Sequence, residues 1–411
     1  MSETATPRYF LAPHFVPSTG AAHAVIDPAT LEEVGKRGDV TSSEIELVLT
    51  RVNTAQALWK KIDAKTRAQT LHRLANRIEA NDMTTCAILM SREMGKPYPE
   101  AIGEVANCAS IFRYYAEMAR DEAGKVAGTT QAGSLQYARY EPYGVSAHIM
   151  PFNFPILLMC WTVAASLAAG NGCVIKPAEA TTLSTLEFMK VFDTLPDDLV
   201  ACLPGGAAVG VALVDSDKTH AIAFTGSVAA GQAVAAAAAR KMKPAVIEAG
   251  GSDPMIITAH APIAIAAAGA VTGAFHMSGQ VCTSTERLYV VDSIHDEFVE
   301  AFVAETRQLR IGNGLDKSEI GPLVSQAALQ KIERLVADAV AKGAKIEIGG
   351  GMPQGLEKGW FFEPTILTGC TPEMEILRTE VFGPVVSIVR VPDFDTAIAM
   401  ANDSPFGLDR Q

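Results

Sequence analysis

The sequence predicts an α/β protein built on parallel, doubly wound sheets. Between residues 145 and 250, five short β-rich runs start 22 to 28 residues apart, with helix-like segments between them. This spacing leaves room for a helical crossover between parallel strands. A second α/β series begins at about residue 252. We therefore expect two α/β halves that face a cleft, where sheets of this kind bind their ligands.

The elements before the first strand series are helical. From about residue 41 to residue 120, apolar residues recur at helical spacing, as Leu71, Leu74 and Ile78 do. Residues 121–142 interrupt this pattern with a polar, alternating stretch. We interpret that stretch as a β-hairpin that stands off the body.

The strands of both halves are predicted from short apolar runs that alternate with helical segments. In the first half the runs span residues 145–150, 173–177, 199–204, 221–226 and 245–251. In the second half the order is a strand at 253–258, an alanine-rich helix that ends before Cys282, a strand at 286–292 and a helix at 295–309.

The composition favours a small-molecule partner. Of the 411 residues 48% are hydrophobic and 19% are charged, so the chain can bury large cores. The net charge of -12 and the absence of any run of five like charges argue against nucleic acid and anionic membranes. The first residues lack a signal-peptide pattern and no apolar stretch of about 18 residues occurs, so we expect a soluble cytoplasmic protein without membrane contact.

Seven scattered cysteines raise the question of which, if any, is reactive. Their number is odd, and they show no CxxC pair and no clustering with histidine, so we expect neither disulfides nor a metal site. Most sit in apolar runs, as Cys173 does, and are typical of buried thiols. Cys282 lies instead in the small, polar stretch HMSGQVCTST. A cysteine hydrolase with His276 or His148 as its base is disfavoured, because neither histidine has an accompanying signature.

Polar residues follow the first two strand runs. Asn153, in PFNFP, is an amide held between prolines and aromatics, which suits an oxyanion donor or a plain turn. Lys176 and Glu179, in KPAE, lie three residues apart at a strand-to-helix corner. They could hold ribose hydroxyls or form a solvated surface pair.

Polar residues also follow the last two runs of the first half. Gly226 and Ser227 open an alanine-rich helix, where they form either an anion site for a pyrophosphate or a simple N-cap. Neither GxGxxG nor GK[ST] occurs, so the usual phosphate-binding patterns do not apply. Glu248, in EAGG, is either a general base or a capping carboxylate.

Taken together, six motifs resemble one family. PFNFP, KPAE, FTGS, EAGG, GQVC and EVFGPV occur in this order, and the resemblance runs from IDPAT near residue 27 to FGL at 406–408. The chain resembles the NAD(P)-dependent aldehyde dehydrogenase superfamily. The resemblance implies that Cys282 is the nucleophile, that Asn153 and the Cys282 backbone N–H form the oxyanion hole, and that Glu248 is the general base.

The resemblance also implies a cofactor site for NAD, with NADP possible. Glu179 would accept from the 2′-OH of NAD and repel the phosphate of NADP, although Lys176 beside it could tolerate a phosphate. The implied cofactor residues are Lys176 and Glu179 for the adenosine ribose, Gly206 and Gly210 on the adenine side, Ser227 with Gly226 at the pyrophosphate, Glu380 and Phe382 at the nicotinamide ribose and ring, and also Phe152 and Phe224.

The resemblance defines the substrate pocket less clearly than the cofactor site. With REMGKP, GSDP and GQVC the chain looks most like the succinate-semialdehyde dehydrogenase branch, whose arginines are replaced by Trp161 and His276. We expect a medium-chain or aromatic aldehyde to be preferred, unless protonated His276 or Arg287 holds a carboxylate. The implied pocket residues are Phe154, Leu158, Trp161, His276, Val281 and Thr283.

The resemblance further implies a domain plan with two Rossmann-like domains. Residues 1–120 and 143–249 would form the NAD-binding domain, 121–142 an oligomerisation hairpin, and 250–411 the catalytic domain. The C-terminal part of the family fold is expected to be absent, and a homodimer or homotetramer is expected if the assembly elements are complete. Two alternatives stay open: an acylating, coenzyme A-dependent relative, which Glu248 argues against, and a catalytically silent, cofactor-binding remnant.

Overall fold

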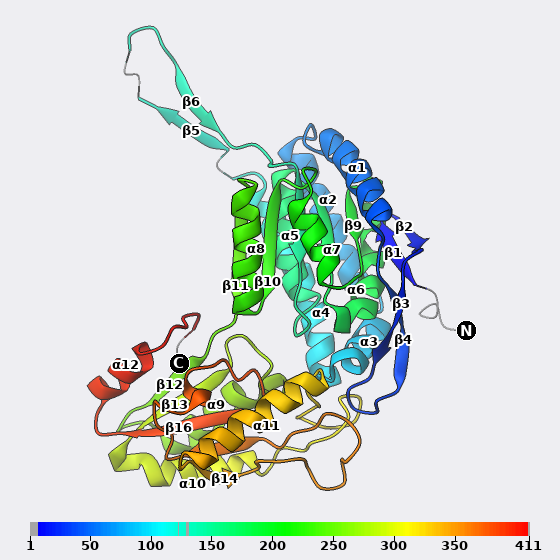
Figure 1. Cartoon of the computed structure of the whole chain (residues 1–411). Helices are drawn as coiled ribbons and strands as arrows, with labels where there is room; N and C mark the ends of the chain where they lie inside the picture. Colours follow the sequence, from blue (N-terminus) through cyan, green and yellow to red (C-terminus); the bar gives the residue numbers. More distant parts are fainter. Residues whose placement is uncertain (1–6, 122, 129–130, 410–411) are drawn as a thin grey trace. The chain divides into compact units, whose positions relative to one another are not determined.

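A computed structural model describes residues 7–121, 123–128 and 131–409, which form two compact units (Figure 1). The first unit comprises Met1–Val25, Gly35–Leu89 and Ile102–Glu248. The second unit comprises Ile26–Val34, Met90–Ala101 and Ala249–Gln411.

A seven-stranded sheet forms the centre of the first unit, in the order β11-β10-β7-β8-β9-β1-β2. Each of the five predicted runs contains one strand: β7 (Val145–Ile149), β8 (Gly172–Lys176), β9 (Val200–Cys202), β10 (Ala221–Gly226) and β11 (Ala245–Ala249). The pairs β10–β7, β7–β8 and β8–β9 are parallel, which confirms the predicted class. The carboxyl ends of these strands therefore lie along one edge of the sheet.

The first sheet is not purely parallel, which corrects the sequence-based expectation. β1 (Arg8–Leu11) pairs antiparallel with both β9 and β2 (His14–Pro17). Only two residues join β1 to β2, and so short a connection permits only an antiparallel hairpin.

Helices cover both faces of this sheet. α1 (Ser42–Trp59), α7 (Ala207–Asp215) and α8 (Val228–Arg240) share one core with Val145, Ala147 and other strand residues. The alternate strand residues Ser146 and His148 form hydrogen bonds with Ser166 and Thr162 of α5 (Leu157–Ala169), which covers the opposite face.

α1 begins at a capping box between Thr41 and Glu44. The other described helices of this unit are α2 (Ala64–Ala80), which packs on α5, α6 (Thr182–Phe188), η2 (Glu179–Thr181) and η3 (Met189–Thr194). Two more helices, α3 (Thr84–Met94) and α4 (Tyr98–Met118), belong partly to this unit and partly to the second.

Two hairpins accompany the first sheet. β3 (Ala22–Ile26) pairs with β4 (Glu33–Gly38) in a two-stranded sheet. β5 (Gly124–Ala127) pairs antiparallel with β6 (Gln136–Arg139), which confirms the predicted hairpin, although residues 122, 129 and 130 lie outside the described part. Its role in assembly stays a prediction.

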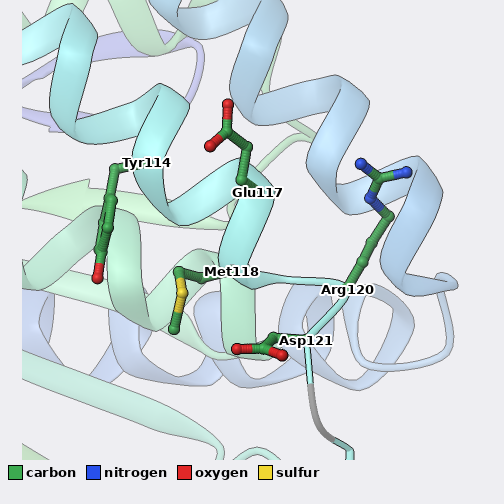
Figure 2. A pocket seen from close by; sticks show the side chains of 5 residues that line it. All are labelled: Tyr114, Glu117, Met118, Arg120 and Asp121. Atoms are coloured by element: carbon green, nitrogen blue, oxygen red, sulfur yellow. The ribbon is translucent and has the colours of Figure 1, made fainter.

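A hollow of about 440 Å³ lies where α4 ends and the chain runs toward this hairpin (Figure 2). It is lined by Tyr114, Glu117, Met118, Arg120 and Asp121.

The second unit is built on a five-stranded sheet in the order β12-β13-β16-β15-β14. The strands are β12 (Asp253–Ile257), β13 (Thr285–Val291), β14 (Lys345–Ile348), β15 (Thr365–Thr368) and β16 (Val385–Val391). The pairs β12–β13, β13–β16 and β16–β15 are parallel, as predicted, whereas β14 is antiparallel to β15. A loop without a helix joins β14 to β15, so the right-handed helical crossover that parallel strands require is missing between them.

The second sheet also has a helical layer on each face. α9 (Ile263–Phe275) and α10 (His295–Thr306) share a core with Leu288 and Val290 of β13. α11 (Gln326–Ala341) and α12 (Phe394–Asn402) share another with Tyr289 and Val291 of the same strand. The described residues of this unit also form the short 3-10 helices η4 (His276–Gly279), η5 (Asp292–Ile294) and η6 (Glu375–Leu377). No helix in the described residues is long and apolar enough to cross a membrane.

Candidate active site

Four of the predicted site residues lie at the carboxyl edge of the first sheet. Lys176 is the last residue of β8, Asn153 follows β7 by four residues, and Ser227 follows β10 directly. Because β10, β7 and β8 are parallel neighbours, their ends share one edge. Glu248 is the last residue but one of β11, the strand next to β10. The first unit thus gathers an amide, an ammonium, a hydroxyl and a carboxylate along one edge.

The segment that carries Asn153 is held by a residue that the sequence did not indicate. Asn153 is 3% exposed and precedes α5, whose N-cap residue Ile156 makes no side-chain cap. Glu104 of α4 supplies the cap: its Oε1 accepts from Ile156 N at 2.8 Å and from Leu157 N at 3.0 Å. Glu104 is itself buried, and its two hydrogen bonds to backbone N–H groups at the start of α5 fix the segment that carries Asn153.

The predicted pocket residues of this unit lie around the start of α5. Trp161 is 49% exposed, and Phe152, Phe154 and Leu158 are partly exposed. The first unit therefore offers a group of accessible aromatic and aliphatic side chains next to Asn153.

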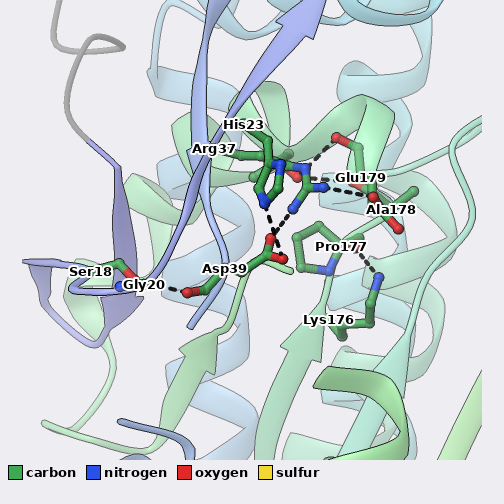
Figure 3. Close-up of polar contacts among 10 residues, drawn as sticks. Ser18, Gly20, His23, Arg37, Asp39, Lys176, Pro177, Ala178 and Glu179 are labelled. Atoms are coloured by element: carbon green, nitrogen blue, oxygen red, sulfur yellow. Dashed lines mark hydrogen bonds and ion pairs between the residues drawn. The ribbon is translucent and has the colours of Figure 1, made fainter. Parts of the chain in front are cut away.

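Lys176 and Glu179 form a polar cluster with a third residue, Arg37 of β4 (Figure 3). Lys176 is buried, its Nζ donates to Pro177 O at 2.8 Å, and burial lowers the pKa of its ammonium. Arg37 donates through Nη2 to Glu179 Oε2 at 2.6 Å and through Nη1 to Asp39. Sequence reasoning missed Arg37, which lies outside all six motifs.

Two glycines, which the resemblance assigns to the adenine side, lie next to this cluster, and that assignment stays a prediction. A Cβ at Gly206, which begins α7, would lie 3.3 Å from Glu179 Oε1. A Cβ at Gly210 would lie 3.5 Å from Lys176 Cδ. A ribose presents several hydroxyl groups that need polar partners, and Lys176 and Glu179 beside small neighbours offer them, so these residues fit a nucleotide.

At the start of α8 the structure shows the capping role of Ser227. Its Oγ accepts from Ala230 N at 3.4 Å, and its side chain is exposed. A Cβ at Gly226 would lie 2.8 Å from Phe224 Cζ, so the phenyl ring requires the glycine. Contact of Ser227 with a pyrophosphate stays a prediction.

Glu248 is exposed and does not cap a helix. Within the described part of the chain its carboxylate has no hydrogen-bond or ion-pair partner. An unengaged carboxylate is able to accept a proton from water, as a general base must.

In the second unit Cys282 follows a backbone segment of unusual conformation. Met277, Ser278 and Gly279 have φ angles of 52°, 57° and 68°. Each non-glycine residue in this left-handed region costs roughly 1 kcal/mol or more and needs support from its surroundings. Ser278 Oγ donates to Gly321 O at 2.9 Å, and a Cβ at Gly279 would lie 2.1 Å from Gly383 O. The loop before Cys282 is therefore held in one shape.

The thiol of Cys282 differs from the other six in its exposure. It is partly exposed, whereas the others are buried, and none of the seven forms a disulfide. Burial raises the pKa of the Cys282 thiol, and the charges of Asp253 and Glu380 raise it further, while the N–H groups of Cys282 and Thr283 oppose the shift. A nucleophilic Cys282 thus needs a base to take its proton. Val281 and Thr283, beside it, are also partly exposed.

Glu380 and Phe382 lie on a tight turn next to the cysteine loop. A Cβ at Gly250 would lie 1.8 Å from Glu380 Oε1, so the glycine makes room for this carboxylate, and burial raises its pKa. Phe382 has a φ of 53°. Glu286 of β13 holds the turn, because its Oε1 accepts from Val381 N and Phe382 N, both at 2.8 Å. Sequence reasoning also missed Glu286.

The charge state of Glu286 leads to a pH-dependent prediction. Burial raises the pKa of this carboxyl to about 7, so the folded chain keeps a proton that the unfolded chain releases near the ordinary carboxyl pKa. Its stabilising contribution is therefore present at low pH and is lost as the pH rises through about 7. Glutamine keeps the Oε1 acceptor and does not ionise. Between about pH 5 and about pH 8, wild type should lose on the order of 2 kcal/mol more unfolding free energy than Glu286→Gln.

Denaturant unfolding at the two pH values measures this difference. Asp253, whose pKa burial raises to about 6, is present in both proteins, so its effect cancels. Equal losses in wild type and Glu286→Gln would contradict the buried, proton-binding state of Glu286.

The remaining pocket residue, His276, is paired within the second unit. His276 Nδ1 lies 3.3 Å from Glu100 Oε1, and this bond raises the pKa of the imidazole against the effect of burial. Arg287, the other candidate cation, cannot hold a substrate: it is 2% exposed and donates twice to Ser252 O, at 2.9 and 2.6 Å. That alternative is wrong.

The predicted catalytic set is divided between the two units. Asn153 and Glu248 belong to the first, and Cys282, Glu380 and Phe382 to the second. Their assembly into one site stays a prediction. The hollow at the end of α4 and a second one of about 220 Å³ beside Tyr289 and Arg378 contain none of the predicted residues. Within the described ranges no group of histidine, cysteine and carboxylate side chains could hold a metal ion.

Comparison with known proteins gives consistent matches over nearly the whole chain. A family model described as "Aldehyde dehydrogenase family" matches residues 15–410. A betaine aldehyde dehydrogenase of Mesorhizobium japonicum is 36% identical over 395 residues, which cover 95% of this chain and 80% of that protein.

Solved structures of similar fold are also aldehyde dehydrogenases or related dehydrogenases. A 3,6-anhydro-L-galactose dehydrogenase in complex with NADP matches with a TM-score of 0.95 at 34% identity, over 98% of this chain and 86% of that chain. A betaine aldehyde dehydrogenase from Staphylococcus aureus in complex with NAD⁺ matches with a TM-score of 0.94 at 29% identity, over 99% and 82%.

These matches correct two expectations. The family match over residues 15–410 does not support the absence of the C-terminal part of the family fold. The relatives carry the names of other aldehyde dehydrogenases, so the expected likeness to the succinate-semialdehyde branch is not supported.

Proposed function

Because this chain belongs to the aldehyde dehydrogenase family, we propose that it oxidises an aldehyde to a carboxylic acid with NAD⁺ or NADP⁺, through a thioester on Cys282. One observation carries the assignment of the nucleophile. Cys282 is the partly exposed thiol among seven, and it follows a loop held in a strained conformation. Strain of this kind gathers at sites where geometry matters more than stability.

The chain's own residues supply the covalent and proton-transfer steps. The Cys282 sulfur, once deprotonated, attacks the aldehyde carbon, and the Asn153 amide with the Cys282 backbone N–H stabilises the resulting oxyanion. A nicotinamide positioned by Glu380 and Phe382 would supply the acceptor for the hydride of that carbon. Glu248 then takes a proton from a water molecule, which attacks the thioester and releases the carboxylic acid and the thiol.

Different residues are proposed to bind different parts of the dinucleotide. Lys176 and Glu179 hold the adenosine ribose, with Gly206 and Gly210 leaving room beside them. Ser227, next to Gly226, would bind the pyrophosphate, and Glu380 and Phe382 would position the nicotinamide ribose and ring. Phe152 and Phe224 are further proposed cofactor residues. The polar cluster around Lys176 and the small neighbours at Gly206 and Gly210 support this assignment.

For the substrate, we favour an aldehyde whose far end is apolar or positively charged. Trp161 is half-exposed, and an indole face binds both apolar groups and cations. His276 is paired with Glu100, so it gives no net positive charge to a second carboxylate. The names of the betaine aldehyde dehydrogenases among the relatives support a cationic substrate.

The substrate proposal predicts an order of specificity. Betaine aldehyde, a medium-chain aldehyde or an aromatic aldehyde should give a kcat/KM at least about tenfold above succinate semialdehyde, because a charge-assisted hydrogen bond worth roughly 1.5–3 kcal/mol is missing for its carboxylate. Trp161→Ala should reduce this preference, whereas the control Tyr114→Ala, another half-exposed aromatic of the first unit, should not.

Initial rates of NADH formation across these aldehydes measure the order. Succinate semialdehyde as the best substrate by tenfold or more would contradict the substrate proposal. Absence of NADH with every aldehyde would contradict the proposed function itself and favour the cofactor-binding remnant.

We also propose that the β5–β6 hairpin is an assembly contact in a homodimer or homotetramer. Val126 and Tyr137 are 76% and 70% exposed on a two-stranded ribbon, an arrangement that is costly for a segment without a partner. Sedimentation velocity, compared between wild type and Tyr137→Lys, distinguishes an assembly that depends on this ribbon from one that does not.

A further inference from the structure

We propose that Arg37 determines cofactor specificity: its guanidinium allows the ribose site to take a 2′-phosphate, so that NADP⁺ binds as well as NAD⁺. This proposal rests on the function proposed above, because it requires Lys176 and Glu179 to hold the adenosine ribose. Arg37 lies in β4, in the same unit as both residues.

Arg37 is a fixed positive charge. Its side chain is 9% exposed, and its two terminal nitrogens point to two different carboxylates, Asp39 and Glu179 (Figure 3). A guanidinium stays charged at every physiological pH, and its planar fork directs its N–H groups. The site therefore holds a preorganised donor that matches a phosphate oxygen in geometry and charge.

Glu179 is the movable partner of this pair. Its side chain is 52% exposed, and it is the first residue of the short helix η2. An ion pair at such an exposed position contributes about 1 kcal/mol or less, so the carboxylate can turn into solvent at small cost. When Glu179 is paired with Arg37, its carboxylate can accept a hydrogen bond from the 2′-OH of NAD⁺. With Glu179 turned away, Arg37 Nη2 is available to a phosphate.

The local charges show why Arg37 is required for binding of a 2′-phosphate. The cluster holds two cations, Arg37 and Lys176, and two carboxylates, Asp39 and Glu179. Without Arg37 a 2′-phosphate would face both carboxylates with Lys176 as the main compensation. His23 adds at most a partial charge, because its Nε2 lies 3.4 Å from Asp39 and its side chain is half-exposed.

The same cluster contains the residue types that suit each of the two cofactors. In dinucleotide sites a carboxylate typically accepts from the 2′-OH of NAD, whereas an arginine accommodates the 2′-phosphate of NADP. This chain has both residue types in direct contact, at 2.6 Å. The start of α7 at Gly206, beside Glu179 Oε1, adds a weak preference for negative charge at the same place.

Binding of two adenosine fragments tests the proposal without any turnover. Adenosine 5′-monophosphate carries the 2′-OH, and adenosine 2′,5′-bisphosphate carries the 2′-phosphate. By isothermal titration, Arg37→Gln should weaken the bisphosphate by about tenfold or more and leave the monophosphate within about threefold, as expected for one charge-assisted hydrogen bond. Arg37→Lys, which keeps the charge, should retain part of the bisphosphate affinity.

Two further variants complete the design. Glu179→Gln should act in the opposite sense, with tighter bisphosphate and weaker monophosphate binding. Arg51→Gln is the matched control, since Arg51 is also an ion-paired arginine of the first unit, with Asp198, and should change neither affinity.

The outcomes separate this proposal from the proposed function. Equal weakening of both fragments by Arg37→Gln, or no change in either, would overturn the specificity role and leave the ribose site intact. Failure of wild type to bind either fragment would overturn the ribose site, and this proposal with it.

Discussion

Cys282→Ala should abolish aldehyde-dependent reduction of NAD⁺, with a loss of at least about a thousandfold in kcat. The reason is that the sulfur forms the covalent bond from which the hydride leaves, and alanine offers no nucleophile. Cofactor affinity should change little, because the proposed ribose residues Lys176 and Glu179 lie in the other unit of the chain. Rates of NADH formation and fluorescence titration with NAD⁺ measure the two properties.

The matched control for this substitution is Cys370→Ala. Cys370 belongs to the same unit, is buried, and has a thiol pKa that burial raises to about 11, so we expect it to take no part in turnover. Cys370→Ala should keep most of the wild-type rate. Retention of more than about a tenth of the rate by Cys282→Ala would show that another group is the nucleophile.

Glu248→Gln should uncouple the two half-reactions. Hydride transfer precedes deacylation, and only deacylation needs the carboxylate to activate water. We expect a burst of roughly one NADH per active site, followed by a steady rate reduced by about a hundredfold or more. Rapid mixing with stopped-flow detection of NADH measures both phases. Glu79→Gln, at an exposed ion pair of the same unit, should behave as wild type.

The same experiment separates the hydrolytic from the acylating alternative. A hydrolytic enzyme turns over without coenzyme A, and its rate depends on Glu248. If wild type needs coenzyme A for turnover and Glu248→Gln keeps the wild-type rate, the acylating alternative is correct and Glu248 is not the base.

Much of the fold could be predicted because its central strands are buried. Every residue of β7 and of β8 is buried, so each appears in the sequence as a short run rich in apolar residues, with Ser146, His148 and Lys176 as its polar members. The spacing between such runs reveals the crossovers. The antiparallel additions β1, β2 and β14 were not predicted. They are four-residue strands whose pairing depends on distant partners rather than on local pattern.

The candidate site could be predicted only where function leaves a local motif. Asn153, Glu248 and Cys282 lie in short, recognisable segments. Arg37, Glu104 and Glu286 act on partners 142, 52 and 95 residues away, so no local pattern reveals them. The positive φ of Phe382 is likewise invisible in the sequence, since a phenylalanine gives no sign of a left-handed turn.

The central claim is that the aldehyde becomes an acyl group on Cys282 while NAD⁺ is reduced. Its most direct test is the mass of the peptides from Glu248→Gln quenched in acid soon after mixing with aldehyde and NAD⁺. We predict that the peptide with Cys282 carries the acyl group, in an amount equal to the NADH of the burst. NADH formed without an acyl adduct, or an adduct on another of the seven cysteines, would contradict this account.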